Sequence, residues 1–94
     1  MRRYVIERDL LGAGNLTASQ LQQIGQTSNA ALRDVGPGVQ WEQSYVTADR
    51  IYCVYLSDNE QLVREHAKLG GFPCTKVSEV ANVIDSLTEF RQPA

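Results

Sequence analysis

The sequence is poor in the residues that most often carry catalysis or hold metal ions. Its 94 residues include one His, one Trp, one Met and two Cys. The separation of Cys53 and Cys74 matches neither a CxxC redox motif nor a zinc ribbon, so both are interpreted as thiols. The sequence contains no recognisable Ser-His-Asp arrangement, glycine-rich phosphate loop, HxxxH or HExxH motif. These absences favour a binding protein over an enzyme.

The sequence also has no basic excess and no long apolar run. The net charge is -2 and the basic residues are scattered, which argues against a nucleic-acid partner. No segment approaches the roughly 20 apolar residues of a membrane span, and the first residues lead into a strand pattern without a secretory apolar region. We therefore expect a cytoplasmic protein. With 43% hydrophobic residues, the chain is expected to form one domain over residues 1–94, in which residues 85–94 are a C-terminal tail.

Hydrophobic periodicity predicts six elements in the order β-α-β-β-α-β. Thr17 and Gln20 form a capping-box pattern at the start of the first helix, and Ser57 or Asp58 caps the second. The four strands are expected at Arg3 to Arg8, Val39 to Thr47, Arg50 to Leu56 and Lys76 to Ile84. This order predicts an α+β, ferredoxin-like sandwich, in which two helices cover one face of a four-stranded antiparallel sheet.

The central hairpin has two faces that both carry large apolar side chains. A two- or four-residue turn would pair Val46 with Ile51 and Glu42 with Tyr55, whereas an odd-length turn or a bulge would exchange the faces. The face expected to be mostly core carries Trp41, Gln43, Tyr45, Tyr52, Val54 and Leu56. The other face is mixed and carries Glu42, Ser44, Val46, Ile51, Cys53 and Tyr55. We expect the face without helices to pack against a second copy, giving a homodimer.

Several short motifs carry a resemblance that covers nearly the whole chain. They are YVIER at the start, SN in the first helix, VQW, SYVT and YCVY in the hairpin, REHA, GFP, and EV followed by ID. In this combination the chain resembles a family of small bacterial ferredoxin-like proteins of unknown function, some of which are named as nickel-binding proteins. The resemblance implies a ferredoxin-like fold, a dimer and nickel. Cys74 departs from it, because a small residue such as Ala is expected after GFP.

Cys53 and His66 are the leading metal-ligand candidates, and each also has a structural interpretation. Cys53 is either a small core residue or a thiolate ligand, because sulfur and imidazole suit nickel, copper and zinc. His66 lies on the inward stripe of the second helix, as a core residue or as a ligand. Glu42 and Glu65 are the nearest supporting carboxylates. A two-fold dimer would double each ligand and could complete a metal geometry that one chain cannot.

The aromatic residues of the hairpin offer a different kind of site. Trp41, Tyr45, Tyr52 and Tyr55 could line a pocket for a planar organic ligand, with His66 as a proton donor or acceptor, or they could simply form core. Three hypotheses result. The first is a binder of nickel or another divalent transition metal, in storage, buffering or resistance. The others are a dimeric small-molecule-binding or enzyme-like module and an interaction domain without chemistry.

Overall fold

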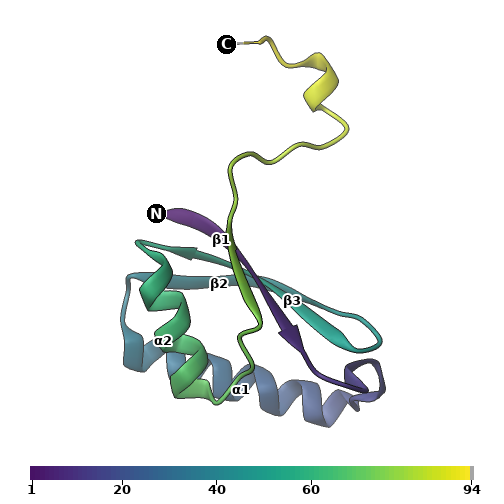
Figure 1. Cartoon of the computed structure of the whole chain (residues 1–94), viewed down its shortest axis with the longest axis vertical. Coiled ribbons are helices and arrows are strands. Elements are labelled where there is room, and N and C mark those ends of the chain that lie inside the picture. The colour runs from purple at the N-terminus through teal and green to yellow at the C-terminus, as the bar shows by residue number, and fades with distance from the viewer. Residues whose placement is uncertain (94) are drawn as a thin grey trace.

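The computed structural model describes residues 1–93 and shows a four-stranded sheet with two helices on one face (Figure 1). Its elements are β1 (Arg2–Asp9), η1 (Ala13–Asn15), α1 (Ala18–Val35), β2 (Val39–Val46), β3 (Arg50–Ser57), α2 (Glu60–Gly70), β4 (Lys76–Glu79) and η2 (Thr88–Phe90). The sheet order is β2-β3-β1-β4, and all three strand pairs are antiparallel. The predicted α+β class and element order are confirmed.

Alternating burial identifies the covered face of the sheet. Along β3, the buried positions are Ile51, Cys53, Tyr55 and Ser57, whereas the residues between them are half-buried. Strand β1 contributes the buried residues Tyr4, Ile6 and Arg8 to the sheet. The face predicted to be mostly core, with Tyr52, Val54 and Leu56, is therefore the face without helices, and that prediction was wrong.

A β-bulge in the hairpin explains part of this difference. Val46 pairs with Ile51 as predicted, but the register shifts between Trp41 and Gln43, so that Trp41 rather than Glu42 lies opposite Tyr55. One extra residue in a strand moves the following side chains to the other face. The bulge therefore puts Trp41 on the covered face, and the predicted pairing of Glu42 with Tyr55 was wrong.

The helices begin where side-chain caps satisfy free backbone N–H groups. Thr17 and Gln20 form the predicted capping box of α1. In α2 the cap is Asn59, whose side chain accepts from the backbone N–H of Leu62. The predicted caps Ser57 and Asp58 were one or two residues too early, because β3 continues to Ser57.

The last strand is shorter than predicted. Strand β4 ends at Glu79 rather than at Ile84, and Val83 and Ile84 are exposed. The chain then runs away from the sheet toward η2 (Figure 1). The tail thus begins near Val80, before the predicted 85–94, and Ala94 lies outside the described residues.

The core lies between the covered face of the sheet and the two helices. It is built from buried residues of β1, β2, β3, η1 and α2: Tyr4, Ile6, Ala13, Val39, Ile51, Cys53, Tyr55 and Val63. Leu21 of α1 and Leu69 of α2 are exposed and lie outside this core. No helix within residues 1–93 has both the length and the apolarity needed to cross a membrane.

Candidate functional site

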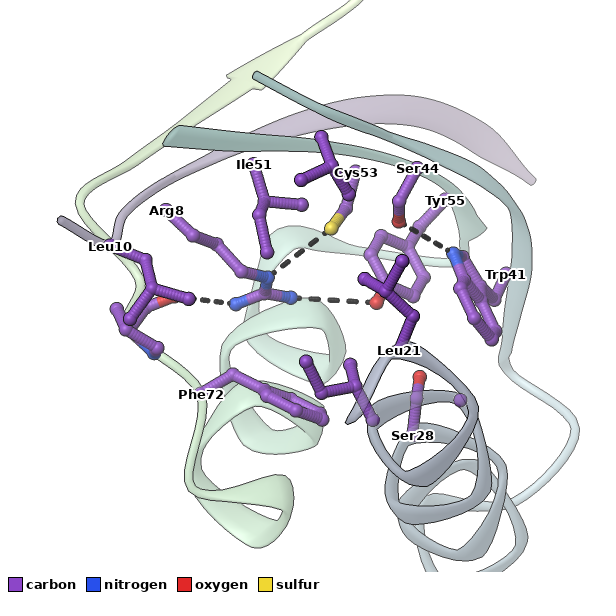
Figure 2. Close-up of a pocket in the computed structure, with 14 residues that line it drawn as sticks. Arg8, Leu10, Leu21, Ser28, Trp41, Ser44, Ile51, Cys53, Tyr55 and Phe72 are labelled. Atoms are coloured by element: carbon purple, nitrogen blue, oxygen red, sulfur yellow. Dashed lines mark hydrogen bonds between the residues drawn. The ribbon is translucent and has the colours of Figure 1, made fainter. Parts of the chain in front are cut away.

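A cavity of about 220 Å³ lies between α1 and the covered face of the sheet (Figure 2). Small residues of α1, Gly25 and Ser28, leave space beside the sheet. Leu21 and Val46 are exposed lining residues and mark the mouth. The lining, which is largely apolar and contains no Asp or Glu, is Arg8, Leu10, Leu21, Ile24, Gly25, Ser28, Trp41, Ser44, Val46, Ile51, Cys53, Tyr55, Phe72 and Pro73.

Arg8 is the charged group of this cavity, and it is only 3% exposed. Its Nε donates to Cys53 Sγ at 3.3 Å, and its two terminal nitrogens donate to Pro73 O at 2.6 Å and to Tyr55 Oη at 3.4 Å. The guanidinium carbon also lies 5.3 Å from the centroid of the Phe72 ring, a cation–π distance. Figure 2 shows Arg8 reaching from the sheet into this group.

Burial and these contacts act in opposite directions on the charge. Burial lowers the pKa of Arg8, but Cys53 and Tyr55 together raise it above its ordinary value, so Arg8 stays a cation. Burial raises the pKa of Tyr55, and Cys53 raises it further, while Arg8 partly opposes both. Tyr55 is therefore a neutral phenol at pH 7. The cavity thus holds a fixed positive charge in a largely apolar setting.

Arg8 has no carboxylate within ion-pair distance among the described residues, a property that it shares only with the exposed Arg33. Elsewhere in residues 1–93, five arginines pair with Asp or Glu at 2.7 to 3.4 Å: Arg2, Arg3, Arg50, Arg64 and Arg91. All five are far more exposed than Arg8. Among the arginines of residues 1–93, Arg8 alone is both buried and without a carboxylate partner.

His66 lies behind the cavity wall and is completely buried. Its Nε2 lies 3.2 Å from both the carbonyl oxygen and Oγ of Ser28. Because a carbonyl oxygen can only accept, Nε2 carries the proton and Nδ1 is the bare nitrogen. Nδ1 has no hydrogen-bond partner among the described residues. Burial lowers the pKa of His66, the Ser28 backbone contact partly opposes this, and Arg8 lowers it further, so the ring is neutral at pH 7.

The structure places His66 between two aromatic rings of the site. Its ring centroid lies 5.1 Å from that of Tyr55 and 5.9 Å from that of Phe72. Since Tyr55 and Phe72 line the cavity, His66 supports its wall from behind without lining it. The contact is one of packing and polarity, suited to positioning the two rings.

The other predicted site residues are dispersed. Glu42 forms an ion pair with Arg3 at 2.8 Å, and Glu65 is exposed on α2. Of the four predicted pocket aromatics, Trp41 and Tyr55 line the cavity. Tyr45 and Tyr52 face each other on the hairpin and are absent from its lining. The metal-ligand roles of Cys53, His66, Glu42 and Glu65 stay predictions.

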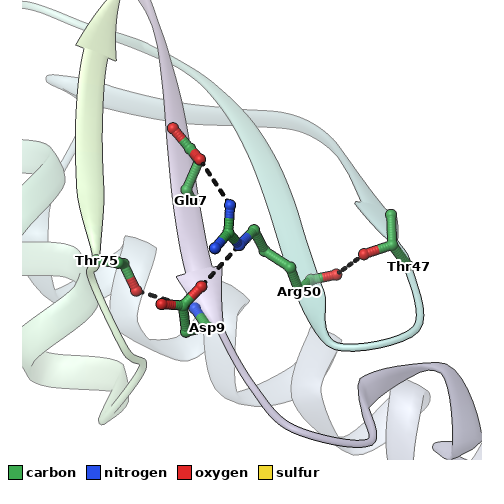
Figure 3. Close-up of polar contacts among 5 residues, drawn as sticks. All are labelled: Glu7, Asp9, Thr47, Arg50 and Thr75. Carbon is green, nitrogen blue, oxygen red and sulfur yellow. Dashed lines mark hydrogen bonds and ion pairs between the residues drawn. The ribbon is translucent and has the colours of Figure 1, made fainter.

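A polar network on the helix-free face holds the end of the hairpin next to β1 (Figure 3). Arg50 Nε donates to Asp9 at 2.7 Å and Nη1 to Glu7 at 3.2 Å, while the carbonyl of Arg50 accepts from Thr47 Oγ1 at 2.7 Å. The backbone N–H of Asp9 in turn donates to Thr75 Oγ1. By holding Arg50 in register, these contacts keep Ile51 on the cavity side of β3.

Most residues that line the cavity were not predicted as site residues from the sequence, among them Arg8, Gly25, Ser28 and Phe72. For Arg8 a signal existed, because it follows Tyr4 and Ile6 at intervals of two and therefore shares their buried face. No comparable signal existed for Phe72, whose position depends on the turn after α2.

These observations define a class: a ferredoxin-like α+β domain with an arginine-containing cavity between its sheet and its first helix. Comparison with known sequences then gives the family. The pattern of the family described as "Nickel responsive protein SCO4226-like" matches residues 4–80, so the chain belongs to this family. The matched segment stops before the tail. Comparison with curated proteins gives no match.

A solved structure supports the fold. The crystal structure of SCO4226 from Streptomyces coelicolor A3(2) is similar to this chain, with a TM-score of 0.74 and 21% sequence identity. The match covers 87% of this chain and 99% of that one. At this identity the likeness establishes the shared fold.

The donor set of the cavity does not fit a nickel ion. Cys53 Sγ accepts from a guanidinium, whose fixed charge repels a second cation. The bare Nδ1 of His66 supplies one ligand atom. Within residues 1–93, no three His, Cys, Asp or Glu side chains come together to hold a metal ion.

Proposed function

We propose that the cavity beside α1 binds a small, largely apolar organic ligand. The observation that carries this proposal is the cavity itself, with aromatic and aliphatic walls and a few convergent polar groups, which is the usual form of small-molecule sites. An apolar cavity of about 150 Å³ holds benzene. A volume of about 220 Å³ therefore leaves room for one ring and a short substituent.

Trp41 allows a direct test, because it is the only Trp and it lines the cavity. We expect small aromatic compounds to change its fluorescence in a saturable way. Gly25→Leu should abolish this response, since a Cβ at Gly25 would lie 3.9 Å from Trp41 Cη2 and a longer side chain would enter the cavity. The matched control is Gln22→Leu, at an exposed position of the same helix. Equal binding by both variants would contradict the proposal.

Direct nickel binding is the second candidate, in storage, buffering or resistance in the cytoplasm. Two observations favour it: the description of the family, and the Nδ1 of His66, which has no hydrogen-bond partner within residues 1–93. Sulfur and imidazole donors also suit nickel. The guanidinium on Cys53 opposes this candidate at the cavity, so it requires ligands from a second copy or from the surface.

Calorimetric titration of the metal-stripped, reduced protein with nickel, zinc and copper separates the two candidates. Micromolar or tighter nickel binding that is lost in both Cys53→Ala and His66→Ala, with both variants folded, would establish the nickel site. We expect these two substitutions to leave any heat of nickel binding unchanged. Under the cavity account, the aromatic probes still bind the metal-free protein.

The partner that we propose is a second copy of the chain. Half-buried apolar side chains from β1 and β3, namely Val5, Val54 and Leu56, lie on the helix-free face. The same strands carry ion pairs of Arg3 with Glu42 and of Arg50 with Glu7 and Asp9. An apolar patch with a charged border is typical of protein interfaces, and two-fold symmetry lets the same patch serve both copies.

A further inference from the structure

Arg8 is a buried cation that forms no ion pair with a carboxylate of residues 1–93. Burying an ionised group is costly unless it is paired, and fully buried arginines are rare without a partner. Arg8 is 3% exposed, and no carboxylate lies within ion-pair distance of it among the described residues. Its contacts with Pro73 and Tyr55 satisfy N–H groups and supply no opposite formal charge.

The hydrogen-bonding capacity of Arg8 is also incompletely used. A guanidinium has five N–H donors in a fixed planar fork. The contacts to Cys53, Pro73 and Tyr55 use one hydrogen on each of its three nitrogens. Each terminal nitrogen therefore keeps one further N–H. Such a fork matches the two oxygens of a carboxylate, and charge-assisted pairs of this kind are among the strongest hydrogen bonds in proteins.

The rest of the cavity complements the body of such a ligand. Trp41, Tyr55 and Phe72 supply ring surfaces, and Leu21 and Ile24 supply aliphatic ones. Because the lining contains no Asp or Glu, no acidic side chain competes for Arg8 or repels an incoming anion. The lining of the cavity therefore carries a positive charge and no acidic side chain.

We propose that the cavity selects organic anions, namely small aromatic or branched carboxylic acids whose carboxylate binds Arg8 and whose apolar body lies against Trp41, Phe72 and α1. This inference rests on the proposed function and specifies the ligand class of the same site. Arg8 determines specificity through charge, and the apolar wall supplies the area buried on binding. Neutral and cationic analogues of the same shape are disfavoured.

Matched probes test the inference on the unmodified protein. Benzoate, phenylacetate and 3-phenylpropanoate place the acid at increasing distance from the ring, and each has an amide of nearly the same shape. Phenethylammonium supplies the opposite charge. Binding is followed by Trp41 fluorescence and calorimetry. We expect at least one acid to bind, its amide to bind roughly tenfold or more weakly, and the ammonium compound to be weaker still.

Variants at Arg8 assign the preference to one side chain. Arg8→Gln should remove the difference between acid and amide, and Arg8→Lys should keep part of it, because the charge remains without the fork. The matched control, Arg64→Gln, removes an exposed arginine of α2 and should leave the preference unchanged. If Arg8→Gln does not fold, the comparison of acids with amides on the unmodified protein decides the question.

The outcomes separate the two levels of the proposal. Amides that bind as tightly as their acids would overturn the anion inference and leave the small-molecule cavity standing. Failure of every acid, amide and ammonium probe to bind would overturn the proposed function itself. A preference for acids that persists in Arg8→Gln would move the recognition of charge away from Arg8 and contradict the assignment.

Discussion

At the scale of single residues, the site depends on two buried polar side chains with opposite protonation behaviour. Arg8 keeps its charge because Cys53 and Tyr55 outweigh the effect of burial, whereas burial of His66 favours the neutral ring. A permanent cation and a neutral imidazole thus lie on the same side of the sheet. The fixed charge of Arg8 attracts an anion and repels a metal cation, whereas the neutral ring of His66 adds no charge.

Neutral His66 leads to a pH dependence of stability. Its pKa in the folded state is lowered from the ordinary value of about 6.5, so below that pH the unfolded chain binds a proton that the folded chain resists. The free energy of unfolding should therefore be highest above about pH 6.5 and should fall as the pH drops toward the folded-state pKa. Urea denaturation at a series of pH values measures this dependence.

The control for this pH effect is His66→Gln, which removes the titrating ring. The variant should show a weaker loss of stability between neutral and mildly acidic pH, whatever its absolute stability. An identical pH profile in both proteins would show that another group is responsible.

Residue identity was easier to predict than residue role. Cys53 and His66 were predicted as candidate metal ligands, and both are buried, but the ligand role stays a prediction. Arg8 was missed because a charged residue at a strand end is normally assigned to solvent, although its period of two with Ile6 pointed inward. Contacts such as Arg8 with Pro73 join residues 65 positions apart, which no local pattern encodes.

At the scale of elements, α1 shapes the cavity and α2 supports its wall, and one glycine in each helix shows the difference. Gly25 faces free space beside Trp41, because a Cβ added at Gly25 would lie 3.9 Å from Trp41 Cη2. A Cβ on Gly70 would lie 2.6 Å from Phe72 Cδ2, so the ring occupies the space that a side chain at position 70 would fill. Phe72 in turn contacts Arg8 and His66.

We predict opposite effects for alanine at these two glycines. Gly25→Ala should stabilise the protein by about 0.5–1 kcal/mol, because Ala is the better helix former and no clash results. Gly70→Ala should destabilise it by about 1–3 kcal/mol, since Phe72 has to move within a packed region. Urea denaturation of both variants provides the measurement. The same sign for both changes would show that helix propensity alone decides and that Phe72 adapts freely.

The order and type of the elements were predictable, whereas their register was not. Alternation in β1 and β3 and the capping box of α1 are local signals, and they led to the correct fold class. The bulge at Glu42 has no local marker such as glycine. It placed Trp41 on the covered face and thereby brought it into the cavity.

At the scale of the whole molecule, the helix-free face sets the expected assembly. We predict a homodimer that Val54→Lys breaks, because a lysine on this face would be desolvated between the two sheets. Gln22→Lys, at an exposed position of α1, is the matched control and should stay dimeric. Light scattering coupled to size-exclusion chromatography measures the mass. A monomeric unmodified protein, or a dimeric Val54→Lys variant, would contradict this interface.

The segment after β4 extends beyond the folded domain. It leaves the sheet after Val80, whose N–H donates to Arg3 O at 2.8 Å, and it exposes Ile84, Leu87 and Phe90. The family match ends at residue 80 as well. Apolar spacing led to a longer last strand in the prediction, because periodicity cannot distinguish a strand paired in a sheet from an unpaired extended segment.

Nuclear magnetic resonance can show residue by residue whether the cavity between α1 and the sheet binds a ligand. Phenylacetate would be added to the isotopically labelled, metal-free protein while the backbone amide signals are recorded. If the cavity binds the acid, we expect saturable shifts that are largest at Gly25, Ser28 and Cys53 and that disappear in Gly25→Leu. Shifts confined to the helix-free face or the tail, or no shifts at any concentration, would contradict it.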